Sequence, residues 1–157
     1  MMGVGWPLAD GPFEAGAMGL VIQSAPSIEA WLEYGQRIRK VDVAFQWVVG
    51  DWLNYGEATY GEMYSQGLAL WPETDYQRLA DYKWVSKAIG FSFRNDRLSW
   101  THHRVVAKLA PQEASDWLAT AEEMDLSASA LRAELNGKHE VETHACPECG
   151  TVHRRKG

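Results

Sequence analysis

The strongest constraint on the fold is a row of large apolar side chains spaced alternately three and four residues apart. The row consists of Trp31, Tyr34, Ile38, Val41, Phe45, Val48, Trp52 and Tyr55. This spacing is typical of an α-helical face that packs lengthwise against a partner. The spacing leaves open whether one helix carries the row or two helices meet near Asp42. It also leaves open a homodimer through this 31–55 seam, but we favour a core within one chain, because flanking charges lack coiled-coil patterning.

The composition fits one globular domain with a small appendage. Of 157 residues, 46% are hydrophobic and 23% are charged, as in proteins with a packed core. No run approaches the ~18 apolar residues of a membrane span, and the N-terminus lacks the features of a secretory leader. We therefore expect a cytoplasmic protein with no membrane partner. Its expected parts are a loose arm over residues 1–26, a helical domain over 27–136 and a tail over 137–157.

A second constraint on the fold comes from the segment after this row, where two stretches with helical periodicity are separated by a short break. Pro72 cannot continue a helix, because it lacks an amide hydrogen and clashes with the preceding turn. Thr74 is placed to cap the next helix, with Gln77 as its capping-box partner. The pattern predicts a helix over 62–71, a turn, and a helix over 76–89. The buried face of the second helix is expected to hold Leu79, Tyr82, Ser86 and Ile89 with Val85 beside them, and the opposite face Tyr76, Gln77, Ala80, Lys83 and Lys87. A DNA-reading helix-turn-helix has this layout, and so does an ordinary helical hairpin.

Charge is distributed unevenly along the chain. The whole chain carries −6, but residues 77–108 hold seven Lys and Arg and two Asp, a net charge of +5. This segregation favours one positive surface on an acidic body, although a run of charge is often only a solvated face. We expect the helix over 76–89 to enter the major groove of double-stranded DNA, with nearby cations on phosphates. The expected DNA-binding residues are Tyr76, Gln77, Arg78, Lys83, Lys87, Arg94, Arg97 and Arg104.

The remaining patterns predict further helices. Ser99 is placed to cap a helix, Pro111 stands where a first helical residue would, and Ser127 is placed to cap a last short helix. Asn136 followed by Gly137 is expected to end that helix. The prediction is an all-α, multi-helix domain that contains a helix-turn-helix, with a small C-terminal zinc-knuckle appendage.

Several short segments have a familiar order and spacing. They are residues 50–53, 55–57, 60–62, 84–85 and 98–103. Together they resemble a family of actinobacterial and phage helix-turn-helix proteins that includes the LmbU-type transcriptional regulators. Residues 98–135 are also similar to the helical segment that follows the helix-turn-helix in ParB-like partition proteins. The resemblance spans residues 31–135 and implies a DNA-binding regulator of a phage or mobile element.

Both cysteines lie in the tail, where Cys146 and Cys149 belong to a Cys-Pro-x-Cys-Gly sequence. This motif holds half of a zinc ribbon, because its two thiolates converge on one metal and its glycine lets backbone amides approach sulfur. Zinc takes four ligands, so we expect structural Zn²⁺ on Cys146, Cys149, His144 and His153, with His139 as the substitute ligand. A redox CxxC is the alternative, but no βαβ pattern surrounds the motif.

An enzyme is not expected. His102 and His103 are adjacent on a helix, so one should face the core and the other the surface. No phosphate-binding loop, nucleophile elbow or dinucleotide fingerprint is present in the sequence. The leading hypothesis is a sequence-specific DNA-binding regulator. The alternative is a protein-interaction module, for example a phage-borne inhibitor of a host defence complex, which the acidic net charge favours.

Overall fold

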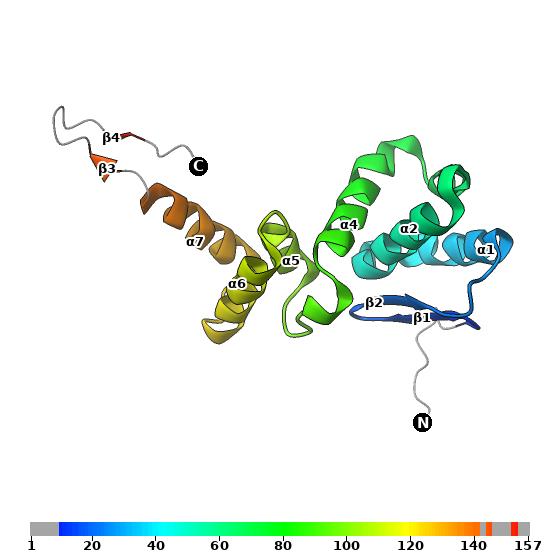
Figure 1. Ribbon diagram of the computed structural model, residues 1–157, viewed down its shortest axis with the longest axis horizontal. Helices are drawn as coiled ribbons and strands as arrows, with labels where there is room; N and C mark the ends of the chain where they lie inside the picture. Colours follow the sequence, from blue (N-terminus) through cyan, green and yellow to red (C-terminus); the bar gives the residue numbers. More distant parts are fainter. Residues whose placement is uncertain (1–9, 142–143, 146–151, 154–157) are drawn as a thin grey trace, which may run out of the picture.

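The computed structural model describes residues 10–141, 144–145 and 152–153, and this part of the chain is mostly helical (Figure 1). A short antiparallel hairpin comes first, made of β1 (Phe13–Gly16) and β2 (Gly19–Ile22). The helices are α1 (Ile28–Ile38), α2 (Gln46–Tyr60), α3 (Ser65–Leu68), α4 (Tyr76–Ala88), α5 (Trp100–Val106), α6 (Pro111–Glu123) and α7 (Ala128–Val141). Short 3₁₀ turns are η1 (Arg39–Ala44), η2 (Gly61–Tyr64), η3 (Glu73–Asp75) and η4 (Phe91–Phe93), and a second pair of strands is β3 (His144–Ala145) and β4 (Val152–His153). The predicted all-α fold class is confirmed, and none of the described helices has the length and apolar character to cross a membrane.

Two tryptophans hold α1 against α2. The rings of Trp31 and Trp52 stack with centroids 4.0 Å apart. Each indole N–H donates to the backbone carbonyl of the other residue, at 3.1 and 3.0 Å. Gly35 and Gly56 lie under these rings, and a Cβ at either position would collide with the indole of the opposite helix. The close approach of the two helices therefore depends on both glycines.

The apolar row of residues 31–55 belongs to two helices joined by η1, and five of its eight side chains are buried within one chain. Tyr34, Ile38 and Val48 are fully or almost fully buried. Phe13 of the hairpin stacks on Tyr34 with ring centroids 4.2 Å apart. The structure does not support the homodimer through this seam, because other elements of the same chain cover much of the face.

The expected loose arm over residues 1–26 contains the hairpin, so its described part is ordered against the body. Phe13, Ala15 and Leu20 are buried in the first core. The Leu20 N–H donates to the Asp51 carboxylate of α2 at 2.9 Å. Glycine-rich strands of four residues are too short for a clear period, which is why sequence patterning did not reveal them.

Helix α4 packs along α2, as the burial of Leu79, Tyr82 and Val85 shows. Gly50 of α2 permits the contact, because a Cβ there would collide with Ser86 and with the Tyr82 carbonyl. The predicted helix over 76–89 is confirmed to within one residue, and its predicted buried face is the one that meets α2.

The helix predicted over 62–71 is wrong. Its place is taken by η2, the four-residue α3 and an irregular bend. The segment bends around the tryptophan pair: a Cβ on Gly67 would collide with the Trp31 ring, and Trp71 lies 5.6 Å from Trp52 between centroids. Thr74 does not cap α4, since that helix begins after Asp75 without a side-chain cap. Tertiary packing has overridden the local helical pattern.

A second core joins α5, α6 and α7. Its buried residues include Val106, Leu118, Ala121, Leu131 and Leu135, and Trp47, Val85 and Ile89 connect it to the α2–α4 pair. Hydrogen bonds confirm the predicted caps Ser99 and Ser127. Pro111 is the first residue of α6, as predicted. The predicted stop at Asn136 and Gly137 is wrong, because α7 continues to Val141. Gly137 keeps a negative φ there, so it does not adopt the left-handed conformation that ends a helix.

Candidate nucleic-acid interface

The outer face of α4 is the first candidate surface. Gln77 and Lys87 are exposed, and Tyr76 is half-buried. Trp84, which is not among the expected DNA-binding residues, is 45% exposed on the same helix. The outward face therefore combines an amide, one exposed cation and aromatic rings.

Carboxylates neutralise two of the expected α4 cations. Arg78 lies 3.1 Å from Asp75 and also donates to the Tyr82 hydroxyl at 3.2 Å. Lys83 lies 2.8 Å from Glu57 of α2. The hydrogen bond from Lys83 lowers the pKa of Glu57 below its ordinary value, against a smaller opposing effect of burial. Lys87 is exposed, and among residues with described side chains no carboxylate lies within ion-pair distance of it.

The expected phosphate contact of Arg94 is corrected, because this side chain is only 2% exposed. Its guanidinium forms a two-pronged ion pair with Asp51, both contacts at 2.7 Å. It also donates to the carbonyls of Met18, Ser86 and Ile89. Arg94 therefore ties the hairpin, α2 and α4 together, and these partners already accept hydrogen bonds from its guanidinium.

The other two cations after α4 lie at the surface. Arg97 is 77% exposed and stands 3.4 Å from Glu122, a loose contact. Arg104 lies 3.0 Å from Asp81 with both groups partly exposed. Surface pairs of this kind contribute only about 0–1 kcal/mol, so neither arginine is held firmly by its carboxylate.

The adjacent histidines take the two environments that the sequence predicts, one inside and one near the surface. His103 is buried and accepts the Asn95 N–H at Nε2, 2.9 Å away, while its Nδ1 donates to the Ser99 carbonyl at 2.7 Å. This pairing fits only the neutral ring, and burial lowers the pKa of His103 to about 4. His102 accepts the Ser99 N–H at Nδ1, so its Nε2 donates to the Leu126 carbonyl at 2.8 Å. Both rings therefore have a structural role, because each forms hydrogen bonds with backbone groups.

The turn between α6 and α7 has a geometry that the sequence reading missed. Asp125 adopts a left-handed conformation, with φ of 52°. The Met124 N–H donates to the Thr120 carbonyl and the Leu126 N–H donates to the Ala121 carbonyl, both at 2.9 Å. The available signal was the separation of two predicted helices by only a few residues, with an Asp that tolerates this conformation.

The expected zinc ligands Cys146 and Cys149 lie outside the described residues. His144 and His153 lie in β3 and β4, whose backbone register pairs them directly across the hairpin. Among the described residues no group of three or more His, Cys, Asp or Glu gathers at a metal-binding distance. For the expected zinc site, the structure therefore gives only the backbone positions of His144 and His153.

Comparison with known proteins relates the chain to regulators. It is 37% identical over 109 residues to the transcriptional regulator NovE of Streptomyces niveus, and this match covers 69% of the chain. The chain spans about half the length of this curated relative, since the match covers 50% of NovE. No protein-family model and no solved structure matches the chain. The similarity supports a relation to transcriptional regulators.

Proposed function

We propose that this protein is a cytoplasmic, sequence-specific DNA-binding transcriptional regulator without catalytic activity. The observation that carries the proposal is the similarity to NovE, whose name describes a transcriptional regulator. The helical body supports it, because small helical domains present helices to the major groove. An origin in a phage or mobile element is part of the same proposal and rests on the resemblance of the 31–135 segment alone.

The α4 surface is one face through which DNA would be bound. Without Arg94, its exposed polar groups are Gln77, Lys87 and Arg97, beside the half-buried Tyr76. Arg78, Lys83 and Arg104 would join them by leaving their carboxylates, which weak surface pairs permit. Binding through this face would therefore release carboxylates as well as counterions.

A gel shift tests the proposed function. Wild-type protein is incubated with random duplexes and with genomic fragments over a range of salt concentrations. We expect a retained complex whose affinity falls steeply with salt, since each neutralised phosphate adds about −0.9 to the slope of log K against log salt. Absence of any complex at about 50 mM salt would contradict the proposal.

A protein-interaction module is the second candidate, and two observations favour it. The expected α4 cations Arg78 and Lys83 already have carboxylate partners. Trp84, Phe91 and Phe93 are large apolar side chains that are about half exposed. A host protein retained by the wild type after nuclease treatment, and released by Trp84→Ala, supports this candidate. A protein that copurifies only while DNA is intact supports the regulator.

We further propose that the tail binds one structural Zn²⁺ through Cys146, Cys149, His144 and His153, with His139 as the substitute for His144. The Cys-Pro-x-Cys-Gly motif supplies the two thiolates. The backbone register supports the histidine pair, because directly opposed residues in an antiparallel ladder lie on the same face. Bound zinc would hold the hairpin closed by joining its two strands to the connecting segment.

A further inference from the structure

Two full helices joined by a short turn, the order of elements in a helix-turn-helix, occur at α6 and α7 and not at the position that the sequence pattern indicates. Helices α6 and α7 have 13 and 14 residues and are separated by four residues that include left-handed Asp125. The Ser127 hydroxyl accepts the Ala130 N–H at 3.1 Å and so begins α7. Before α4, by contrast, stands a four-residue helix followed by a longer irregular segment. Two full helices joined by a four-residue turn meet the length and turn requirements of the motif.

The three helices of this part are fixed to one another. Leu118 and Ala121 of α6 and Leu131 and Leu135 of α7 are buried in the second core. His102 of α5 donates to the Leu126 carbonyl in the turn itself. Because the turn and both helices are anchored, the outer face of α7 is presented in a defined orientation.

The exposed side of α7 carries polar and small residues, and Glu134 is the one carboxylate among its described side chains. At about 100° per residue, Ser129, Arg132, Ala133 and Asn136 fall within one narrow arc, and all four are exposed. Arg pairs with guanine, Asn with adenine, and Ala contacts the thymine methyl group in the major groove. This set of side chains matches the chemistry of base edges.

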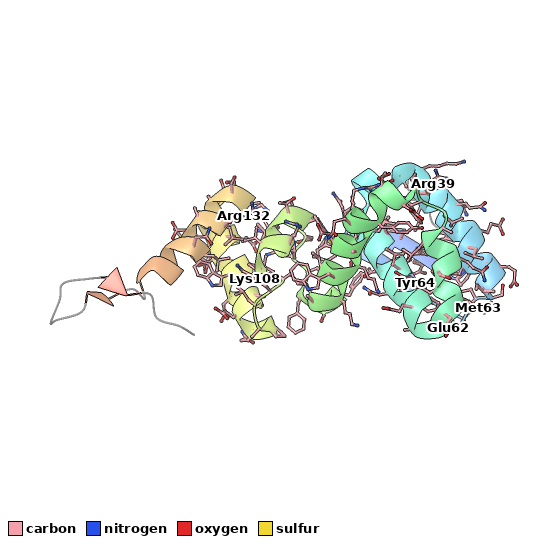
Figure 2. All side chains as sticks on the ribbon, turned by 90° about the horizontal axis from the view of Figure 1, so that it is seen from above. Arg39, Glu62, Met63, Tyr64, Lys108 and Arg132 are labelled. Atoms are coloured by element: carbon pink, nitrogen blue, oxygen red, sulfur yellow. The ribbon has the colours of Figure 1, made fainter. Side chains whose placement is uncertain are left out.

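Two cations in this part of the molecule lack carboxylate partners among the described side chains, unlike Arg78 and Lys83 on α4. Arg132 on α7 and Lys108 before α6 are exposed, and neither has a carboxylate within ion-pair distance among the side chains that the structure describes. Figure 2 shows both over the part of the molecule formed by α5–α7, far from Arg39 at the other end. Lys108 also precedes the N-terminus of α6, where the helix dipole favours a phosphate.

We propose that α7 is the helix that reads the major groove of double-stranded DNA, with Arg132 and Asn136 on base edges and Lys108 on a phosphate. This inference rests on the proposed DNA-binding function and specifies its reading surface. It departs from the expected reading helix α4, whose residues then lie outside the base contacts.

The test begins with duplexes selected from a random library by the wild-type full-length protein. Affinity for the selected duplex is then measured by fluorescence anisotropy for Arg132→Ala and Asn136→Ala. Each variant is expected to bind roughly 10- to 100-fold more weakly, as loss of one two-pronged base contact implies. Reselection with either variant should relax the preference at one base pair. Lys108→Ala should instead weaken all sequences equally and reduce the salt slope by about one phosphate.

Two control variants distinguish a failure of the α7 proposal from a failure of the proposed DNA-binding function. Arg39→Ala removes an exposed arginine at the far end of the molecule and should leave affinity unchanged. The double variant Arg78→Ala/Lys83→Ala tests α4 directly. If the double variant loses binding while Arg132→Ala and Asn136→Ala bind as wild type, α7 is not the reading helix but the DNA-binding function stands. If the wild type selects no sequence and binds no duplex, both proposals are overturned.

Discussion

Removal of Arg94 should destabilise the protein strongly, although the residue looks like a surface cation in the sequence. Its guanidinium is 2% exposed, pairs with Asp51 at 2.7 Å and stacks 4.1 Å above the Trp47 ring. Arg94→Ala would leave the Asp51 carboxylate, itself only 16% exposed, without its cation. Removing one partner of a buried pair costs about 3–5 kcal/mol, which is a large share of the ~5–15 kcal/mol stability of a typical domain.

The assay is thermal and urea unfolding, followed by circular dichroism. The expected loss corresponds to a fall in Tm of roughly 6–20 °C for a chain of this size. Arg97→Ala is the matched control, because the Arg97 side chain is 77% exposed and makes a loose contact with Glu122 at 3.4 Å. This variant should lose at most about 1 kcal/mol of stability. Adding Asp51→Asn to Arg94→Ala should recover part of the loss, since the uncompensated charge is removed. Equal losses for Arg94→Ala and Arg97→Ala, or a further loss in the double variant, would refute this reasoning.

Three further predictions concern α5, the α6–α7 turn and the tail. Because the folded pKa of His103 is about 4 against 6.5 for the free side chain, the unfolded chain protonates first as pH falls. The contribution of His103 to stability should therefore be constant well above pH 6.5 and fall by roughly 3 kcal/mol toward pH 4, and urea titrations of His103→Leu should lack this part of the slope. Asp125→Gly should raise stability by up to about 1 kcal/mol and Asp125→Val should lower it, because glycine alone adopts positive φ without strain. Changes in Tm of the same sign for the two variants would contradict this prediction. Mass spectrometry should find one Zn²⁺ per chain and none in Cys146→Ser/Cys149→Ser, with the helical melting of residues 10–141 unchanged; equal zinc in both proteins would exclude the site.

Elements defined by neighbouring residues were predicted well. Ser99, Pro111 and Ser127 begin helices where their caps predict, because a helix start is satisfied by groups within three residues. The buried face of α4 followed from its periodicity for the same reason. The helix over 62–71 failed because Gly67 and Trp71 pack on a tryptophan pair contributed by other helices.

The candidate site was predicted only in part. Local pattern placed Gln77 and Lys87 on an outer helical face, and the structure exposes both. It could not show that Arg78 and Lys83 have carboxylate partners, since Lys83 pairs with Glu57 on another helix. The turn at Asp125 was also missed, because any residue sequence that ends one helix and begins another is compatible with several backbone turns.

Local chemistry along the chain was enough to establish a helical protein with an aromatic core, its main caps and a regulator-like order of segments. Only the folded chain decided which charges face solvent. Asp51 and Arg94 are 43 residues apart in sequence yet form a buried pair, and Arg132 stays exposed on α7. The reason is physical: caps and helical faces depend on neighbours within a turn or two, whereas the neutralisation of a charge depends on whichever distant group the core brings beside it.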